Sequence, residues 1–313
     1  MAGLTLAAAA VSLSWAVTAV WLGPRIGYVE APGEDPLKTH ARPAVPLGGI
    51  GVFLGVHIAM ALGGRFDPAL LAATSVVVVL GLVDDRRPLP PYLRIAGWSL
   101  AAGIVALDAT GVVTGMVLAA VAIVAIASVN LLDGLDGLAG GSALVAAAGL
   151  AFLAGARDVD HALPLLVAGA LAGFLVLNWH PARVFLGDSG AYLVGVLLAW
   201  SMAKASPGSA ADLVVAAGVL GVFIVDLVVT ILRRLSGRRP LFAGDRSHVY
   251  DQLRQRGRRV ADIALWAAAL QAAFVAVVLF ADRFLPGITG ALTVAGALGI
   301  AVAALVIAGF ARG

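Results

Sequence analysis

Long apolar runs alternate with short polar breaks along the whole chain. Runs near the roughly 20 residues that a spanning helix needs predict about 10–11 transmembrane helices. Their approximate limits are residues 3–22, 46–63, 69–83, 93–107, 111–130, 138–155, 162–178, 190–204, 211–232, 261–281 and 286–310, of which the third and fourth are short. We therefore predict an all-α, polytopic helical membrane protein.

The composition agrees with this pattern, because 61% of the 313 residues are hydrophobic and 12% are charged, against about 45–50% and about 25% in soluble domains. The first run lacks a preceding basic segment, so we expect a first transmembrane helix and not a cleaved signal peptide. There is no cysteine for disulfide or thiol chemistry. We expect residues 1–313 to form a single integral-membrane domain.

Positive charge is distributed unevenly between the two alternating sets of loops. With the adjacent helix ends, one set carries 17 of the 21 Lys and Arg residues. The positive-inside rule makes this set cytoplasmic, with the N-terminus outside and the C-terminus cytoplasmic. Its loops lie near residues 23–45, 84–92, 131–137, 179–189 and 233–260.

One polar cluster follows the fifth apolar run. Asn130, Asp133 and Asp136 recur every three residues, so they share one side if the helix continues through them. A carboxylate at the mouth of a membrane is costly unless it binds a cation or faces water, which makes the stretch a candidate site. An ordinary turn would explain the two Asp-Gly pairs as well.

Two other clusters carry aspartates at the ends of spans. Asp84 and Asp85 repel one another, which raises one pKa and suits a general base, unless a metal or the neighbouring Arg86 and Arg87 keep both ionised. The alternative is a salt-bridge cluster at a helix end. Asp188, flanked by glycines, could ligate Mg²⁺ or could cap the eighth helix.

Three further signals are weaker when taken alone. Basic residues before a Pro-Leu-Gly-Gly helix entry could bind an anion or could anchor the loop; they are Lys38, His40 and Arg42. Asp226 lies inside the ninth apolar run, where a carboxylate is functional or paired. His248, among arginines that include Arg246, suits phosphate recognition, with an interfacial segment that binds anionic lipid as the alternative.

Apart from Asp226, these signals form five clusters on cytoplasmic loops, all on one face. Together they indicate a site for phosphoryl groups, where a metal and basic residues neutralise charge. A site at the membrane surface suggests one lipid-borne and one cytosolic phosphate substrate. No GxxxxGK[ST] or GxGxxG motif argues for an ATPase or a dinucleotide enzyme. The rival function is a lipid-linked sugar transporter (a flippase), but transporters place polar residues near the bilayer midplane.

In this order the motifs resemble those of the polyprenyl-phosphate N-acetylhexosamine-1-phosphate transferases. The matching stretches are Asp84-Asp85 with Leu89-Pro90, Asn130 to Gly137, Phe185 to Gly190 and Asp245 to His248. The resemblance implies attack by polyprenyl (undecaprenyl) phosphate on a UDP-sugar, with release of UMP. The product is a polyprenyl-diphosphate-sugar that starts cell-envelope glycan synthesis at the cytoplasmic face of the bacterial inner membrane.

The resemblance also implies residue roles and a cofactor. Asp188 would be the principal ligand of Mg²⁺ (or Mn²⁺), while Asp84 and Asp85 would contact or deprotonate the lipid phosphate, with Asp84 also at the metal. Substrate-binding roles would fall to Lys38, His40, Arg42, Asn130, Asp133, Asp136, Asn178, Phe185, Arg246 and His248.

The last motif departs from the family pattern His-x-His-His, because Tyr250 and Asp251 follow His248. We therefore favour the branches that prime glycan lipids with N-acetylglucosamine or a related N-acetylhexosamine. The alternative within the family is the phospho-N-acetylmuramoyl-pentapeptide transferase of peptidoglycan synthesis. Membrane lipids are expected partners and nucleic acid is not, while a homodimer and the sugar itself are left open.

Overall fold

The structure is a computed structural model that describes residues 1–30, 43–107, 112–206, 210–240, 246–285 and 287–311. Within these ranges the chain is folded into α-helices and one short 3-10 helix, and its β-type pairings are isolated bridges. The elements are α1 (Ala2–Arg25), α2 (Gly48–Leu62), α3 (Pro68–Arg86), α4 (Pro91–Ala106), α5 (Val112–Leu132), α6 (Leu138–Ala156), α7 (Ala162–Asn178), α8 (Gly187–Ala205), α9 (Ala210–Ala217), η1 (Gly218–Leu220), α10 (Gly221–Ser236), α11 (Val249–Gln255), α12 (Val260–Phe284) and α13 (Ile288–Ile307).

Each predicted span coincides with a helix, and the ninth is the broken run α9–η1–α10. Among the described residues, seven helical segments are long and apolar enough to cross a membrane, and α2 and α7 are shorter apolar helices. The prediction of an all-α polytopic membrane protein is confirmed. The third span is longer than predicted, because α3 has 19 residues and includes both Asp84 and Asp85. The orientation of the termini stays a prediction.

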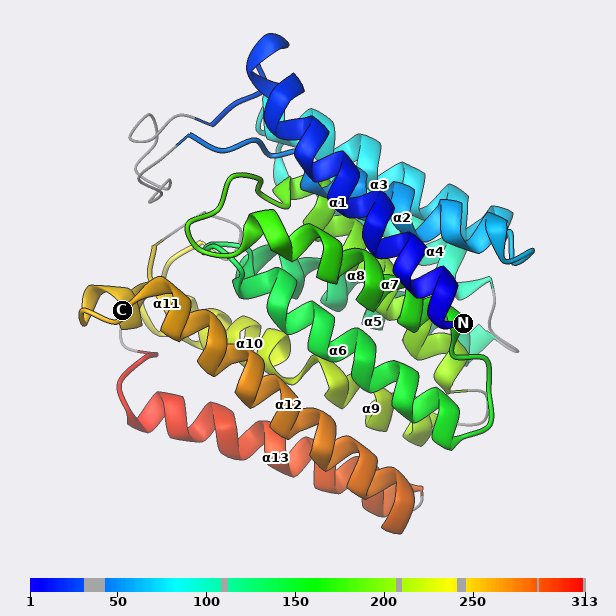
Figure 1. Cartoon of the computed structure of the whole chain (residues 1–313). Helices are drawn as coiled ribbons and strands as arrows, with labels where there is room; N and C mark the ends of the chain where they lie inside the picture. The colour runs from blue at the N-terminus through cyan, green and yellow to red at the C-terminus, as the bar shows by residue number, and fades with distance from the viewer. Residues whose placement is uncertain (31–42, 108–111, 207–209, 241–245, 286, 312–313) are drawn as a thin grey trace.

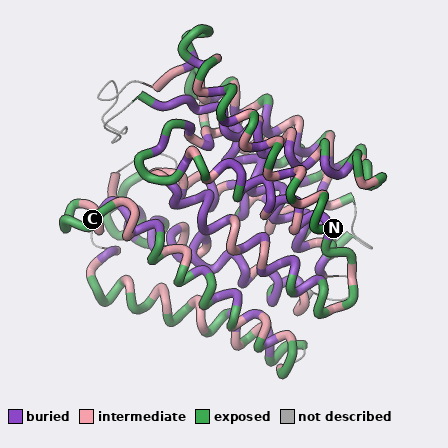
Figure 2. Tube along the Cα trace, in the orientation of Figure 1, coloured by how far each residue is buried: buried purple, intermediate pink, exposed green. Residues whose placement is uncertain are grey.

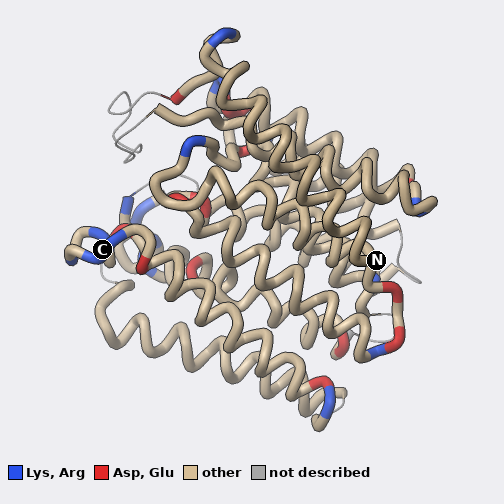
Figure 3. Tube along the Cα trace, viewed as in Figure 1, with Lys and Arg blue, Asp and Glu red and all other residues tan. Residues whose placement is uncertain are grey.

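The helices run back and forth along a common direction (Figure 1). α1 packs against α2 and α7, whereas α12 and α13 lie side by side on another flank of the bundle. α1 starts at one end of the bundle and α13 finishes at the other (Figure 1). Most charged residues lie toward the two ends of the bundle (Figure 3), so most of its length is apolar, as a membrane core requires.

Helix α8 forms the centre of the bundle, as the buried region of Figure 2 shows. It is buried throughout from Ser189 to Met202 and packs against α2, α3, α5 and α6. Small residues let these helices approach closely. A Cβ on Gly195 would lie 2.4 Å from Ile126 Cα of α5, and one on Gly81 of α3 would lie 2.3 Å from Ser189 Cα.

This packing predicts that Gly195→Ala lowers the midpoint of thermal unfolding in detergent, because the added methyl meets the backbone of α5. Overpacking of this kind costs about 1–3 kcal/mol. Gly103→Ala in α4 is the matched control, since a Cβ there meets nothing within 4 Å. A midpoint for Gly195→Ala that equals or exceeds that of the control would contradict the close contact.

Candidate active site

The carboxylate of Asp85 caps the first turn of α8 from the neighbouring helix α3. Its Oδ1 accepts a hydrogen bond from the backbone N–H of Asp188 at 2.8 Å, and its Oδ2 accepts one from Ser189 N–H at 3.4 Å. A carboxylate is favourable at a helix N-terminus. The alternative prediction that Asp188 caps α8 is wrong, because the N-cap residue is Leu186 and Asp188 lies inside the first turn.

Asp84 is buried, and both of its carboxylate oxygens have partners. Oδ1 accepts from Leu89 N–H at 2.7 Å, whereas Oδ2 accepts from the Tyr192 hydroxyl at 2.6 Å and lies 2.7 Å from Arg94 Nε. Asp84 therefore connects α3 to α4 and α8. The role of Asp84 at a metal stays a prediction, and its present contacts are those of a structural anchor.

The alternative prediction, a salt-bridge cluster at this helix end, is confirmed for Asp84, but its partner is not one of the two arginines that were predicted. Asp84 pairs with Arg94, at the start of α4, and not with Arg86 or Arg87. The guanidinium of Arg86 instead lies 4.6 Å from the ring centre of Tyr28. The pairing follows from the turn between α3 and α4, which brings the start of α4 back onto the end of α3.

Asp133 and Asp136 lie in a turn and not on a helix. α5 ends at Leu132 and α6 begins at Leu138, so the conditional prediction of a helix continuing through them is wrong. Gly137 adopts a φ of 72° in this turn, a conformation that glycine allows without steric cost. Within this turn the side chain of Asp136 makes hydrogen bonds to described residues, whereas that of Asp133 does not.

Asp136 and Asn178 fasten this turn to the loop before α8. Asp136 Oδ2 accepts from Ala182 N–H at 3.0 Å and lies 2.8 Å from His180 Nδ1. Asn178 Oδ1 accepts from Gly137 N–H at 3.1 Å, while its Nδ2 donates to the carbonyl of Val184 at 2.9 Å. The two predicted substrate-binding residues therefore also hold two loops in one arrangement.

Phe185 joins the same loop to the entry of α2. Its N–H donates to the carbonyl of Val45 at 2.9 Å, and its carbonyl accepts from Gly48 N–H at 2.9 Å. The first N–H groups of α2 are thereby satisfied by another loop. The basic residues predicted in the first loop, Lys38, His40 and Arg42, lie outside the described residues.

Three predicted polar side chains remain uncommitted. No hydrogen bond within the described part of the chain reaches the side chains of Asn130, Asp133 or Asp188. Desolvation raises the pKa of Asp133 to about 8, and the negative charge of Asp188 acts in the same direction. Asp133 and Asp188 therefore repel one another when both are ionised. A bound cation would relieve this repulsion.

The fifth predicted loop reaches this region through Tyr250. Its hydroxyl donates to the carbonyl of Leu131 at 3.0 Å, and its ring stacks on His248 with centroids 5.2 Å apart. A Cβ on Gly134 would lie 2.2 Å from the Tyr250 hydroxyl oxygen. Arg246 lies 3.4 Å from the carboxylate of Asp251. The motif around His248 is thus packed onto the turn that carries Asp133.

Sequence reasoning missed three residues of this region: Glu30, Arg94 and Tyr192. Tyr192 follows Asp188 by one helical turn, a spacing that places both on one side of α8 and could have indicated it. The charge of Glu30 also raises the pKa of Asp133. Glu30 forms a bridge with Ala44 across the first loop, and nothing in its sequence surroundings indicated that contact.

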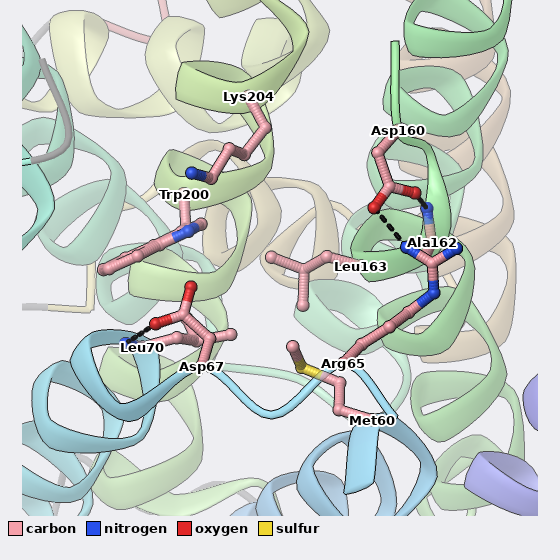
Figure 4. Close-up of a pocket in the computed structure, with 9 residues that line it drawn as sticks. All are labelled: Met60, Arg65, Asp67, Leu70, Asp160, Ala162, Leu163, Trp200 and Lys204. Carbon is pink, nitrogen blue, oxygen red and sulfur yellow. Dashed lines mark hydrogen bonds and ion pairs between the residues drawn. The ribbon is translucent and has the colours of Figure 1, made fainter. Parts of the chain in front are cut away.

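A cavity of about 150 Å³ lies at the other end of the bundle (Figure 4). Its lining residues are Met60, Arg65, Asp67, Leu70, Asp160, Ala162, Leu163, Trp200 and Lys204. None of the predicted site residues belongs to it. Trp200 and Lys204, at the C-terminal end of α8, line this cavity, whereas Asp188 lies in the first turn of the same helix, so the cavity and the acidic cluster are separated by the length of α8.

The fold and this cluster define a helical membrane protein with an acidic site at one end of its bundle. Residues 68–206 match glycosyl transferase family 4. The undecaprenyl-phosphate alpha-N-acetylglucosaminyl 1-phosphate transferase of Haemophilus influenzae is 30% identical, over 74% of this chain and 73% of that protein. The chain belongs to glycosyl transferase family 4.

Two further relatives help to distinguish the branches of the family. The decaprenyl-phosphate N-acetylglucosaminephosphotransferase of Mycobacterium tuberculosis is 29% identical over 88% of this chain and 82% of that protein. The phospho-N-acetylmuramoyl-pentapeptide-transferase of Heliobacterium modesticaldum is 33% identical, but over only 40% of this chain and 39% of that protein. The likeness to the N-acetylglucosamine enzymes is therefore the more extensive one.

The raised pKa of Asp133 predicts a pH dependence of stability. The unfolded aspartate loses its proton near pH 4, whereas the folded one keeps it up to about pH 8. The unfolded state therefore binds fewer protons in this window, and stability falls as the pH rises through it. Without divalent cations, we expect the unfolding midpoint to fall from pH 5 to pH 8 and to fall by less in Asp133→Asn.

The control for this measurement is Asp158→Asn, which replaces an exposed carboxylate at the other end of the bundle. Its midpoint should follow the wild-type pH dependence. Equal slopes for Asp133→Asn and wild type would show that Asp133 does not hold its proton in the folded protein.

Proposed function

We propose that the protein transfers N-acetylglucosamine-1-phosphate, or the phosphate of a related N-acetylhexosamine, from a UDP-sugar to a polyprenyl phosphate and releases UMP. The proposal depends mainly on one observation. At one end of the helical membrane bundle, the carboxylates of Asp133 and Asp188 accept no hydrogen bond from the described residues. Two relatives are named for a polyprenyl phosphate and N-acetylglucosamine, which supports both parts of the proposal. The proposed setting is the cytoplasmic face of the bacterial inner membrane.

The donor set fits a magnesium ion. Across the described residues no group of three or more His, Asp or Glu side chains could hold a metal by itself. Mg²⁺ does not need such a group, since it binds through one or two carboxylates, several waters and substrate phosphates. Asp188, with Asp133 nearby, offers that number of oxygen ligands. When bound, the ion would neutralise charge on the transferred phosphate.

In the proposed reaction an oxygen of the lipid phosphate attacks the β-phosphorus of the UDP-sugar. A bond forms between that oxygen and the β-phosphorus, the bond from the β-phosphorus to the bridging oxygen breaks, and that oxygen leaves on UMP. Catalysis of such a step is mainly positioning and charge stabilisation. Asp85 holds the start of α8, and so sets where Asp188 presents its carboxylate.

The remaining predicted residues have separate parts in this proposal. Asp84 fixes the helix that carries Asp85, through Tyr192 and Arg94. The nucleotide-sugar would be bound along the turn and loop that Asp136 and Asn178 hold together. Contacts to this substrate are assigned to Asn130, Asp133, Asp136, Asn178 and Phe185, with Lys38, His40, Arg42, Arg246 and His248 for its phosphates.

The two alternatives fit less well. A transporter would bind its substrate near the middle of the bilayer, whereas the carboxylates without hydrogen-bond donors lie where α5 ends and α8 begins. The polar groups inside α10, Asp226 and Thr230, are already engaged with His248. The match to a phospho-N-acetylmuramoyl-pentapeptide-transferase covers a shorter part of this chain than the matches to the N-acetylglucosamine enzymes. At the two positions where the family often has histidines, Tyr250 and Asp251 are engaged in packing and capping.

The proposal predicts that purified protein converts radiolabelled UDP-N-acetylglucosamine and undecaprenyl phosphate into labelled lipid and UMP in the presence of Mg²⁺. Asp188→Asn should lower the rate by about a hundredfold or more, as loss of a charge-stabilising group does. Asp262→Asn, in the first turn of α12 at the same end, is the control and should stay within about twofold of wild type.

A panel of UDP-sugars in the same assay identifies the donor. Release of UMP with none of them, while labelled lipid-linked sugar crosses vesicle membranes, would favour the transporter. Activity only with a UDP-N-acetylmuramoyl-pentapeptide donor would favour the peptidoglycan-precursor branch.

A further inference from the structure

Helix α10 carries a polar stripe inside an otherwise apolar segment. Asp226, Thr230 and Arg233 follow one another at four and three residues, a spacing that places them on one side of a helix. All three are buried, and Arg233 is fully so. The stripe lies within residues 211–236, one of the segments able to span a membrane. Buried polar groups at such a place are costly unless they are paired.

The side chains of this polar stripe make hydrogen bonds to the segment that leads into α11. Asp226 Oδ2 lies 2.9 Å from His248 Nδ1, and Asp226 Oδ1 accepts from Val249 N–H at 3.4 Å. Thr230 Oγ1 also lies 3.2 Å from His248 Nδ1. One turn further on, the guanidinium of Arg233 donates to the carbonyl of Ser247. Three successive residues are thereby fixed to one side of α10.

The contact with Asp226 also fixes how the His248 ring is protonated. An ionised carboxylate only accepts hydrogen bonds, so beside an ionised Asp226 it is Nδ1 that carries the hydrogen between the two groups. The ring is buried and stacks on Tyr250 at an interplanar angle of 11°. Its orientation is thus set by Asp226 on its edge and by Tyr250 on its face.

The other side of this segment rests on the proposed active site. Tyr250 donates to the carbonyl of Leu131 and fills the space above Gly134. Burial raises the pKa of Tyr250 well above its ordinary value, with the negative charge of Asp226 acting in the same direction, so its hydroxyl stays a donor. Asp133 lies between these two contact points. A continuous set of contacts therefore leads from Asp226 to the turn that carries Asp133.

We propose that Asp226 is a positioning residue, which holds His248 in one tautomer and one orientation beside the turn of Asp133. The inference rests on the proposed transferase function and adds a role for the carboxylate inside α10. Asp226 itself does not touch substrate, and it acts through His248. Its removal should therefore lower the turnover number while leaving binding of the UDP-sugar largely intact.

The kinetic test compares Asp226→Ala, Asp226→Asn, His248→Gln and the double variant Asp226→Ala/His248→Gln. We expect Asp226→Ala to lower kcat by about 10–100-fold, as loss of an orienting partner does, with KM for the UDP-sugar within about twofold. Asp226→Asn keeps an acceptor oxygen and should recover part of the loss. The double variant should be no slower than His248→Gln alone, because the effects of residues that act as one unit do not add.

The matched control is Asp282→Ala, which removes the carboxylate partner of Arg157 at the other end of the bundle, 2.6 Å away. It should lower the unfolding midpoint about as much as Asp226→Ala while kcat stays within about twofold of wild type. Fully additive losses in the double variant, or a wild-type kcat in Asp226→Ala, would overturn the proposal.

A spectroscopic test needs no activity. The chain has five histidines, so the ¹⁵N spectrum of histidine-labelled protein is simple enough for assignment by His248→Gln. We expect a protonated Nδ1 on His248 in wild type, and its loss or shift in Asp226→Ala. If the wild-type protein shows this signal but has no transferase activity, only the proposed transferase function is contradicted. If His248 is protonated only at Nε2, only the positioning role of Asp226 is contradicted.

Discussion

The hydrogen bonds from the first turn of α8 to the carboxylate of Asp85 hold the acidic end of the bundle together. They satisfy backbone N–H groups that no helix can satisfy for itself, and they do so from a neighbouring helix. The start of the central helix is therefore placed relative to α3 by two hydrogen bonds to one side chain. The glycine contacts of Gly81 and Gly195 then fix how closely α3 and α5 approach α8 along its length.

This anchoring divides the acidic residues into two kinds. Both oxygens of Asp84 and Asp85, and one oxygen of Asp136, accept from protein donors, so these residues define the positions of helices and loops. Asp133 and Asp188 have no such donors within the described residues and keep their oxygens available. A site for phosphate needs both kinds, because free carboxylates perform their task only where their backbone cannot move.

The apolar runs predicted the helices well, because a membrane span has a required length that can be read from the residues alone. The chemistry at the helix ends was less predictable. That Asp133 and Asp136 form a turn depends on where α5 stops, which apolar periodicity does not define. That Asp84 pairs with Arg94 and Tyr192 depends on a tertiary arrangement of three helices. The motif order indicated which residues gather, but not which of them are already engaged with each other.

The contact between Tyr250 and Gly134 has a consequence for how this protein can change over generations. The aromatic ring occupies the volume that a side chain at 134 would need, so neither position can be altered freely while the other stays as it is. A smaller residue at 250 would leave room for a side chain at 134, whereas the tyrosine present favours glycine there. Two positions far apart in the chain are thus coupled by their packing, and we expect the effect of a substitution at one to depend on the residue at the other.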